Sequence, residues 1–169
     1  MALIKAVVDY VKEIKQVKLP RLRLPPPPSP PTSPWLPPYK GWYKVNADGA
    51  VFSKVGWCEI GVVIRNERGL LIESMSKKIE LPLGPLEVEA RAVEKGVRLT
   101  WDLDLKKIVL KSDSQSMVNA LRVLNMSPSS ILKVVEGTRL ELSCFDECGI
   151  SHTRRSGNSA THVICQVGF

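Results

Sequence analysis

The sequence lacks any run of about 18 apolar residues, the length that a helix needs to cross a bilayer. Residues 1–19 carry six charged side chains and no continuous apolar stretch, so we expect neither a membrane span nor a secretory signal peptide. Proline is scarce after residue 40, where only three of the 13 prolines lie. We therefore expect the folded domain in that part of the chain.

Cysteine and histidine are also few, with four and two residues in 169. The cysteines at 58, 144, 148 and 165 form neither a CxxC pair nor a zinc pattern, and Cys144 and Cys148 could supply only half of a site. We expect reduced, mostly buried thiols in an intracellular protein. This spacing argues against a zinc module and against a disulfide framework.

The chain is basic, with a formal net charge of +7, and 44% of its residues are apolar. Residues 1–40 hold seven basic and two acidic side chains, so most of the basicity belongs to this arm. Apolar spacing over residues 3–17 predicts an amphipathic helix, and residues 25–31 predict a polyproline II linker. A protein partner of the proline-rich arm is the alternative to a plain linker. We place the domain at residues 41–169 and expect a monomer.

After residue 41 the pattern predicts a mixed sheet flanked by helices, in the order β-β-β-α-β-α-α-β-α. Alternation from Trp42 to Asp48, with Gly49 as its end, indicates a strand with one apolar and one polar face. A loop that ends in Gly69 joins the next two strands as a hairpin. The expected later strands are 59–65, 70–78, 108–110 and 150–153, and the expected helices are 85–101, 115–124, 129–142 and 159–167.

Three carboxylates fall at positions that suit chemistry. At 100° per residue Glu89 lies inside the apolar stripe of its helix, which includes Trp101, whereas Glu94 falls on the face expected to be solvated. Asp113 follows a short apolar strand, and Asp48 closes the first strand. Taken singly, these acids also suit a helix dipole, a helix cap and a turn. Together they could meet at one point, where a hard cation such as Mg²⁺ would offset their repulsion.

Four short stretches then carry a resemblance to a known family. Residues 42–167 resemble the ribonuclease H type 1 domain, in particular the branch common in plants and often descended from retroelements. The matching stretches are residues 44–50 (KVNADGA), 87–92 (EVEARA), 112–115 (SDSQ) and 152–162. The resemblance implies an α/β fold with a mixed five-stranded sheet, three antiparallel strands followed by parallel ones, flanked by helices.

The resemblance also implies a function and its site. Members cut the RNA strand of RNA/DNA hybrids with Mg²⁺ or Mn²⁺, and the implied metal ligands here are Asp48, Glu89 and Asp113. The implied nucleic-acid contacts are Gly49, Ser114 and Asn158. The charge pairs at 77–78 and 154–155 are further candidates for phosphate contacts, although such pairs are usually just solvated surface.

One position departs from the family pattern, since His162 replaces the fourth catalytic aspartate. Imidazole is a poor ligand for Mg²⁺ and a tolerable one for Mn²⁺. His162 is therefore a candidate catalytic residue, as a ligand or proton-transfer group, with packing in the last helix as the alternative. Our first hypothesis is a nuclease that acts on RNA/DNA hybrids. The second is a catalytically weak or inactive nucleic-acid-binding module of the same fold. An adaptor that recruits proteins through the arm is a third hypothesis.

Overall fold

The computed structural model describes residues 36–123 and 127–167. They belong to the unit Pro31–Phe169, one of the two into which the chain divides. The helix expected over residues 3–17 and the proline-rich linker lie outside the described residues, so the domain boundary at residue 41 stays a prediction. Within the described residues, no helix combines the length and the apolar character needed to span a bilayer.

Three antiparallel strands open the domain, as the sequence predicts. They are β1 (Tyr43–Phe52), β2 (Trp57–Arg65) and β3 (Leu71–Ile79). β1 continues past Gly49, its predicted end, because β2 pairs with it along its length, up to Phe52 opposite Trp57. The expected hairpin between β2 and β3 is present, with Gly69 at a φ of +76°.

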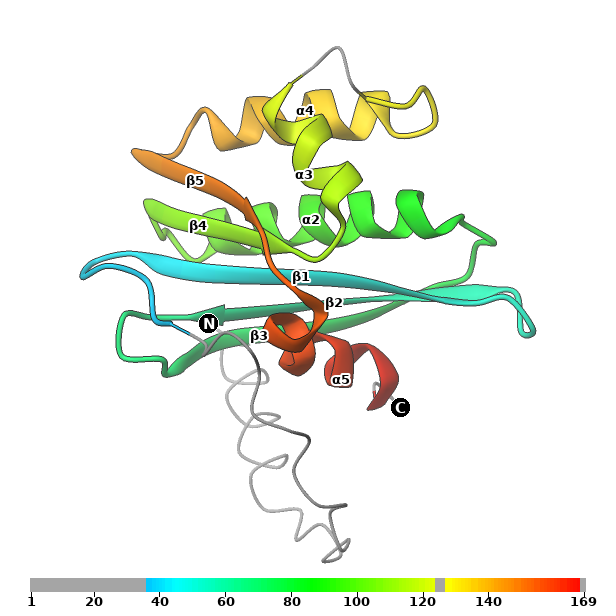
Figure 1. Cartoon of the computed structure of the whole chain (residues 1–169), viewed down its shortest axis with the longest axis horizontal. Helices are drawn as coiled ribbons and strands as arrows, with labels where there is room; N and C mark the ends of the chain where they lie inside the picture. The colour runs from blue at the N-terminus through cyan, green and yellow to red at the C-terminus, as the bar shows by residue number, and fades with distance from the viewer. Residues whose placement is uncertain (1–35, 124–126, 168–169) are drawn as a thin grey trace, which may run out of the picture. The chain divides into compact units, whose positions relative to one another are not determined.

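Two parallel strands complete one sheet of order β3-β2-β1-β4-β5 (Figure 1). β4 (Lys107–Ser112) lies parallel to β1, and β5 (Glu147–His152) lies parallel to β4. β5 begins three residues before its predicted start, since its pairing with β4 extends through Glu147 and Cys148. The predicted fold class, a five-stranded mixed sheet with helices, is confirmed.

In the part of the chain that the structure describes, four α-helices and one 3₁₀ turn flank this sheet. They are α2 (Pro85–Asp102), α3 (Gln115–Arg122), α4 (Leu132–Leu142), η2 (Arg155–Asn158) and α5 (Ser159–Val167). α4 starts later than the predicted Ser129, because the N–H of Ile131 bonds the carbonyl of Pro128 and closes a turn before the helix.

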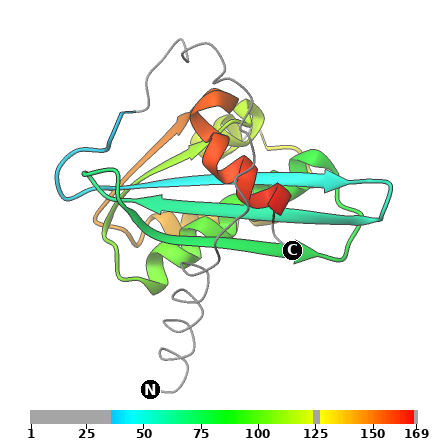
Figure 2. The ribbon, with the colours of Figure 1, turned by 90° about the horizontal axis from the view of Figure 1, so that it is seen from below.

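The central strand β1 is covered on both faces. α2 packs on one face, where Gly96 lies close to Val45 and Val62, and α5 packs on the other (Figures 1 and 2). A Cβ at Gly61 would meet the sulfur of Cys165 at 2.6 Å, so β2 and α5 are in close contact. The polar face predicted for β1 exists but is buried, because α5 lies over it.

The predicted faces of α2 need two corrections. Glu94, expected in solvent, is only 8% exposed, whereas Trp101, expected in the apolar stripe, is 45% exposed. At 100° per residue Glu94 and Trp101 lie about 20° apart, so they differ by their level along the helix and not by their face. Glu94 is covered by Arg91 and Arg98 where α4 packs beside α2, whereas Trp101 lies near the C-terminal end of α2. Trp101 instead makes an edge contact with Phe145.

All four cysteines are free thiols, as expected. Two of them, Cys58 and Cys165, are buried. Cys144 and Cys148 are exposed, so the expectation of mostly buried thiols holds for half of the set.

Candidate metal centre

Three carboxylates from three different elements meet at one point. Asp48 comes from the middle of β1, Glu89 from the start of α2, and Asp113 from the residue after β4. One oxygen of each lies within 4.8 Å of the others. The convergence that the sequence predicts is therefore present, because the parallel register of β1 and β4, with Asn46 opposite Lys111, places Asp48 level with Asp113 just past the carboxyl end of β4.

A close approach of backbone to backbone brings Glu89 into this group. A Cβ built on Gly49 would lie 2.8 Å from the carbonyl carbon of Val88 and 3.0 Å from the amide nitrogen of Glu89. Only glycine fits this contact, so Gly49 lets the start of α2 sit directly against β1. The side chain of Glu89 is thereby held beside Asp48.

The electrostatics of the site favour a bound cation. Burial, and then the charges of Asp48 and Asp113, raise the pKa of Glu89 to about 8. Burial and the charge of Asp113 also raise the pKa of Asp48, against the lowering effect of hydrogen bonds from His162 and the Gly49 backbone. Carboxylates that resist ionisation in this way are stabilised by a divalent ion, and an all-oxygen donor set suits Mg²⁺ or Mn²⁺. The residues present therefore fit such a metal.

His162 lies against this cluster from the first turn of α5. Its Nδ1 is 3.1 Å from Oδ2 of Asp48, whose side chain is 4% exposed. The sequence left two roles open for His162, one at the metal centre and one in the packing of the last helix. The imidazole contacts a carboxylate of the cluster, which favours the first role. Unlike an aspartate, the ring of His162 adds no negative charge to the three carboxylates.

Asn158 orients Asp113 from beneath. Its Nδ2 donates to the carbonyl of Ala47 at 3.0 Å and to Oδ1 of Asp113 at 3.1 Å. Its Oδ1 accepts from Nδ2 of Asn46 at 2.9 Å, and Asn158 itself is 1% exposed. Its amide group is therefore bonded within the protein, whereas a direct contact with nucleic acid stays a prediction.

Two supporting residues escaped the sequence reasoning. Asn46 holds Asn158, and Ser112 lies with its hydroxyl 3.5 Å from Oε2 of Glu89 while accepting from the N–H of Ser114 at 3.1 Å. A signal existed for Asn46, because it stands two residues before Asp48 and so on the same face of the strand. Ser112 had a signal as well, because it opens the matching stretch 112–115 and directly precedes Asp113.

The remaining predicted residues line the same region. The hydroxyl of Ser114 caps α3 by accepting from the N–H of Met117, and Nε2 of His152 lies 3.1 Å from the carbonyl oxygen of Asp113. The two charge pairs differ, since Arg154 and Arg155 are exposed directly before Asn158. The side chains at 77 and 78 point to opposite faces of β3, so they do not act as a pair.

A family model described as reverse transcriptase-like matches residues 46–168. The chain belongs to this family. Its sequence is also 31% identical over 88 residues to a putative ribonuclease H protein of Arabidopsis thaliana, a match that covers 52% of this chain and 14% of that protein. This reverse transcriptase-like chain thus corresponds to a small part of that longer plant protein.

Solved structures with the same fold include ribonucleases H. RNase H1 of the archaeon Halobacterium salinarum superposes with a TM-score of 0.69 at 20% identity, covering 74% of this chain and 95% of that one. LC11-RNase H1, solved in complex with an RNA/DNA hybrid, gives a TM-score of 0.62 at 17% identity and covers 73% and 94%. These likenesses establish the fold, and with the family match they confirm the resemblance to ribonuclease H.

Proposed function

We propose that this protein is a metal-dependent endoribonuclease that hydrolyses the RNA strand of RNA/DNA hybrids. The observation that carries the proposal is the meeting of Asp48, Glu89 and Asp113 within 4.8 Å, where β1 passes the carboxyl end of β4. The family supports it, as does the structural likeness to LC11-RNase H1, which binds a hybrid.

In this proposal Asp48, Glu89 and Asp113 hold Mg²⁺ or Mn²⁺ through carboxylate oxygens. A metal ion in such a site lowers the pKa of water and stabilises the charge on the leaving oxygen. The chain's own part is to fix the three carboxylates before substrate arrives. Asn158 does this for Asp113, and the Gly49 contact does it for Glu89.

His162 takes the place next to Asp48 at which the family has an acid. Its ring contacts Oδ2 of Asp48, so it can hold that oxygen or carry a proton at Nδ1 beside it. Because imidazole binds Mn²⁺ better than Mg²⁺, we expect activity in Mn²⁺ to exceed activity in Mg²⁺.

Substrate contacts in the proposal surround the carboxylates. Gly49 and Ser114 offer backbone and hydroxyl groups next to Asp48 and Asp113, and Asn158 is the third predicted contact. Arg154 and Arg155, exposed beside Asn158, are suited to phosphates. Such contacts release counterions, so hybrid binding should weaken as salt rises.

The test is cleavage of a hybrid with a 5′-labelled RNA strand, with Mg²⁺ or Mn²⁺, by wild type and Asp113→Asn. We expect cutting of the RNA strand alone and its loss in the variant, whereas Asp146→Asn, an exposed aspartate, should keep wild-type rates. Calorimetry with Mn²⁺ gives a second readout, since Asp113→Asn should also weaken metal binding. A hybrid that stays uncut in the presence of Mg²⁺ and of Mn²⁺ would exclude the proposed nuclease activity.

The second candidate is a nucleic-acid-binding module with little catalysis, and His162 is the observation that favours it. His162→Asp separates the two candidates. If Mg²⁺-dependent cutting appears only in this variant, the natural chain is the binding module with a weakened metal site. If the natural chain already cuts in Mn²⁺, the enzyme stands.

A further inference from the structure

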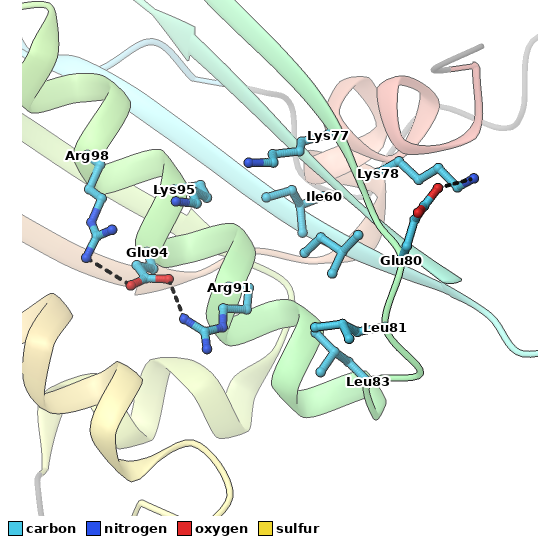
Figure 3. A pocket seen from close by; sticks show the side chains of 11 residues that line it. Ile60, Lys77, Lys78, Glu80, Leu81, Leu83, Arg91, Glu94, Lys95 and Arg98 are labelled. Carbon is cyan, nitrogen blue, oxygen red and sulfur yellow. Dashed lines mark hydrogen bonds and ion pairs between the residues drawn. The ribbon is translucent and has the colours of Figure 1, made fainter. Parts of the chain in front are cut away.

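A groove of about 490 Å³ runs between β3 and α2, which we call the β3–α2 groove (Figure 3). It lies away from the metal centre, because Arg91 and Arg98 stand on the opposite side of α2 from Glu89 at 100° per residue. Its floor is aliphatic, formed by Ile60, Ile79, Leu81 and Leu83. Leu81 is 56% exposed, so the groove presents apolar surface to solvent.

The rim of this groove is cationic. Five of its eleven lining residues are Lys or Arg and two are Glu, and of the five cations only Lys78 has its side chain on the other face of β3. Lys77 pairs in register with Ile60, so its side chain stands on the α2 side of the sheet, above the aliphatic floor. Lys78 and Glu80 form an ion pair with each other at the outer edge, whereas Lys95 lies on the helix wall (Figure 3).

The helix wall and the floor of the groove are both fixed in place. On the helix wall Glu94 accepts from Arg91 at 3.0 Å and from Arg98 at 3.1 Å, yet each arginine side chain is still 48% exposed and can donate outward. At the floor the thiol of Cys58 lies 3.4 Å from the carbonyl oxygen of Leu81 and 3.6 Å from that of Leu83. A preorganised lining reduces the entropy lost on binding, which is typical of a binding site.

We propose that the β3–α2 groove binds an acidic segment of a partner protein that carries aliphatic side chains. Charge complementarity requires an anionic partner, and the aliphatic floor requires apolar groups within it. Sites for single-stranded nucleic acid stack bases on aromatic rings, and none of the eleven lining residues is aromatic. The chain's own arm, residues 1–40, is basic and would be repelled.

Fluorescence anisotropy of the full chain with a labelled peptide in which Glu alternates with Leu tests the proposal. We expect binding that weakens with salt and falls about ten-fold or more in Lys77→Glu/Lys95→Glu. The charge-matched control Lys54→Glu/Lys133→Glu, with both residues exposed elsewhere, should bind as wild type. Leu81→Ser should weaken this peptide but not oligoglutamate. Thermal melting checks folding, and Lys77→Gln/Lys95→Gln replaces the reversal if that variant unfolds.

Three results would overturn the proposal. The first is no binding of the peptide, the second is binding that survives the substitutions at 77 and 95, and the third is single-stranded DNA that binds more tightly than the peptide and is lost in the same variant. The third would make the groove a nucleic-acid site. The inference does not rest on the proposed nuclease function, because Asp113→Asn should bind the peptide like wild type.

Discussion

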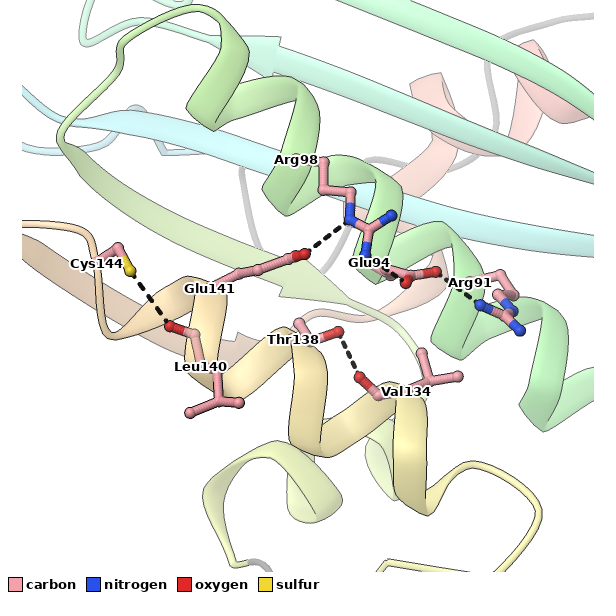
Figure 4. A network of polar contacts seen from close by, with 8 residues as sticks. All are labelled: Arg91, Glu94, Arg98, Val134, Thr138, Leu140, Glu141 and Cys144. Carbon is pink, nitrogen blue, oxygen red and sulfur yellow. Dashed lines mark hydrogen bonds and ion pairs between the residues drawn. The ribbon is translucent and has the colours of Figure 1, made fainter.

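One helix, α2, carries a half-buried glutamate and a buried one with opposite surroundings. Glu94 is 8% exposed and is held between Arg91 and Arg98, the second of which also donates to Glu141 at 2.7 Å (Figure 4). Glu89, five residues earlier, faces two other carboxylates. Burial alone therefore does not say what a carboxylate is for, because the charges around it decide.

The difference separates a structural ion network from a site that needs a ligand. At Glu94 the protein supplies the opposite charge itself, and the network joins α2 to α4. At Glu89 the neighbours have the same sign, so the pKa of this carboxyl rises to about 8. A folded chain that keeps such a cluster gains stability when a divalent cation binds to it.

The largest expected effect is the pH dependence of stability without metal. Between the ordinary pKa of 4.5 and the folded value of about 8, the folded protein holds a proton on Glu89 that the unfolded chain has released. This contribution is complete below about pH 4.5 and is lost as pH rises through about 8. We expect the free energy of unfolding to fall by about 3 kcal/mol from this cluster, less than the full shift because the carboxyls are coupled.

Urea unfolding of wild type and Glu89→Gln at pH 5 and pH 8.5 measures this effect. The free energy of unfolding of Glu89→Gln should rise relative to that of wild type as pH increases, because the amide of Gln does not ionise. Saturating Mn²⁺ should flatten the wild-type dependence and leave the variant nearly unchanged. A constant difference between the two proteins at both pH values would mean that Glu89 titrates normally.

Glu94→Gln should move stability in the opposite direction. Removing the charge leaves Arg91 and Arg98 without their shared partner, and we expect a loss of about 2 kcal/mol, below the usual cost for a fully buried pair because both arginines are half exposed. Urea unfolding at pH 7 without metal measures it. Unchanged stability would mean that the ion pairs of Glu94 contribute no more than those of an exposed residue.

The sequence predicts the surroundings of Glu89 but not those of Glu94. The 3.6-residue period placed Glu89 correctly toward the sheet, because the apolar side chains of α2 mark that face. The same period was used to place Glu94 in solvent and Trp101 in the apolar stripe, although the two lie about 20° apart on α2. Glu94 is covered and Trp101 is exposed because their levels along the helix have different neighbours, which periodicity does not describe.

The site shows the same limit. Asp48, Asp113 and Glu89 could be expected together from strand ends and a helix face. The bonds that hold them, from Asn46 to Asn158 and from Asn158 to Asp113, join residues more than 40 positions apart and depend on how α5 crosses the sheet. The register of β1 with β4 sets those distances, and periodicity does not determine register.

Gly49→Ala should act on the metal centre through geometry alone. The added methyl group would meet Val88 at 2.8 Å and push the start of α2 from β1. We expect a loss of about 1.5 kcal/mol and Mn²⁺ binding about ten-fold weaker, measured by urea unfolding and calorimetry. Gly137→Ala is the control, since nothing lies within 4 Å of its Cβ in α4 and alanine favours a helix, so stability should rise slightly. Equal Mn²⁺ affinity in Gly49→Ala and wild type would mean that the close contact at Gly49 does not position Glu89 for metal binding.

The smallest expected effects concern the two cations around Glu94. Among the described residues, Arg98 bonds both Glu94 and Glu141, whereas Arg91 bonds Glu94 alone. Because each arginine is half exposed and screened by water, we expect losses of about 1 kcal/mol for Arg98→Ala and about 0.5 kcal/mol for Arg91→Ala in urea unfolding. The order matters more than the size, since Arg98 ties α2 to α4 and Arg91 does not. Should Arg91→Ala cost more, Glu94 would depend on one partner and the link to Glu141 would add nothing to stability.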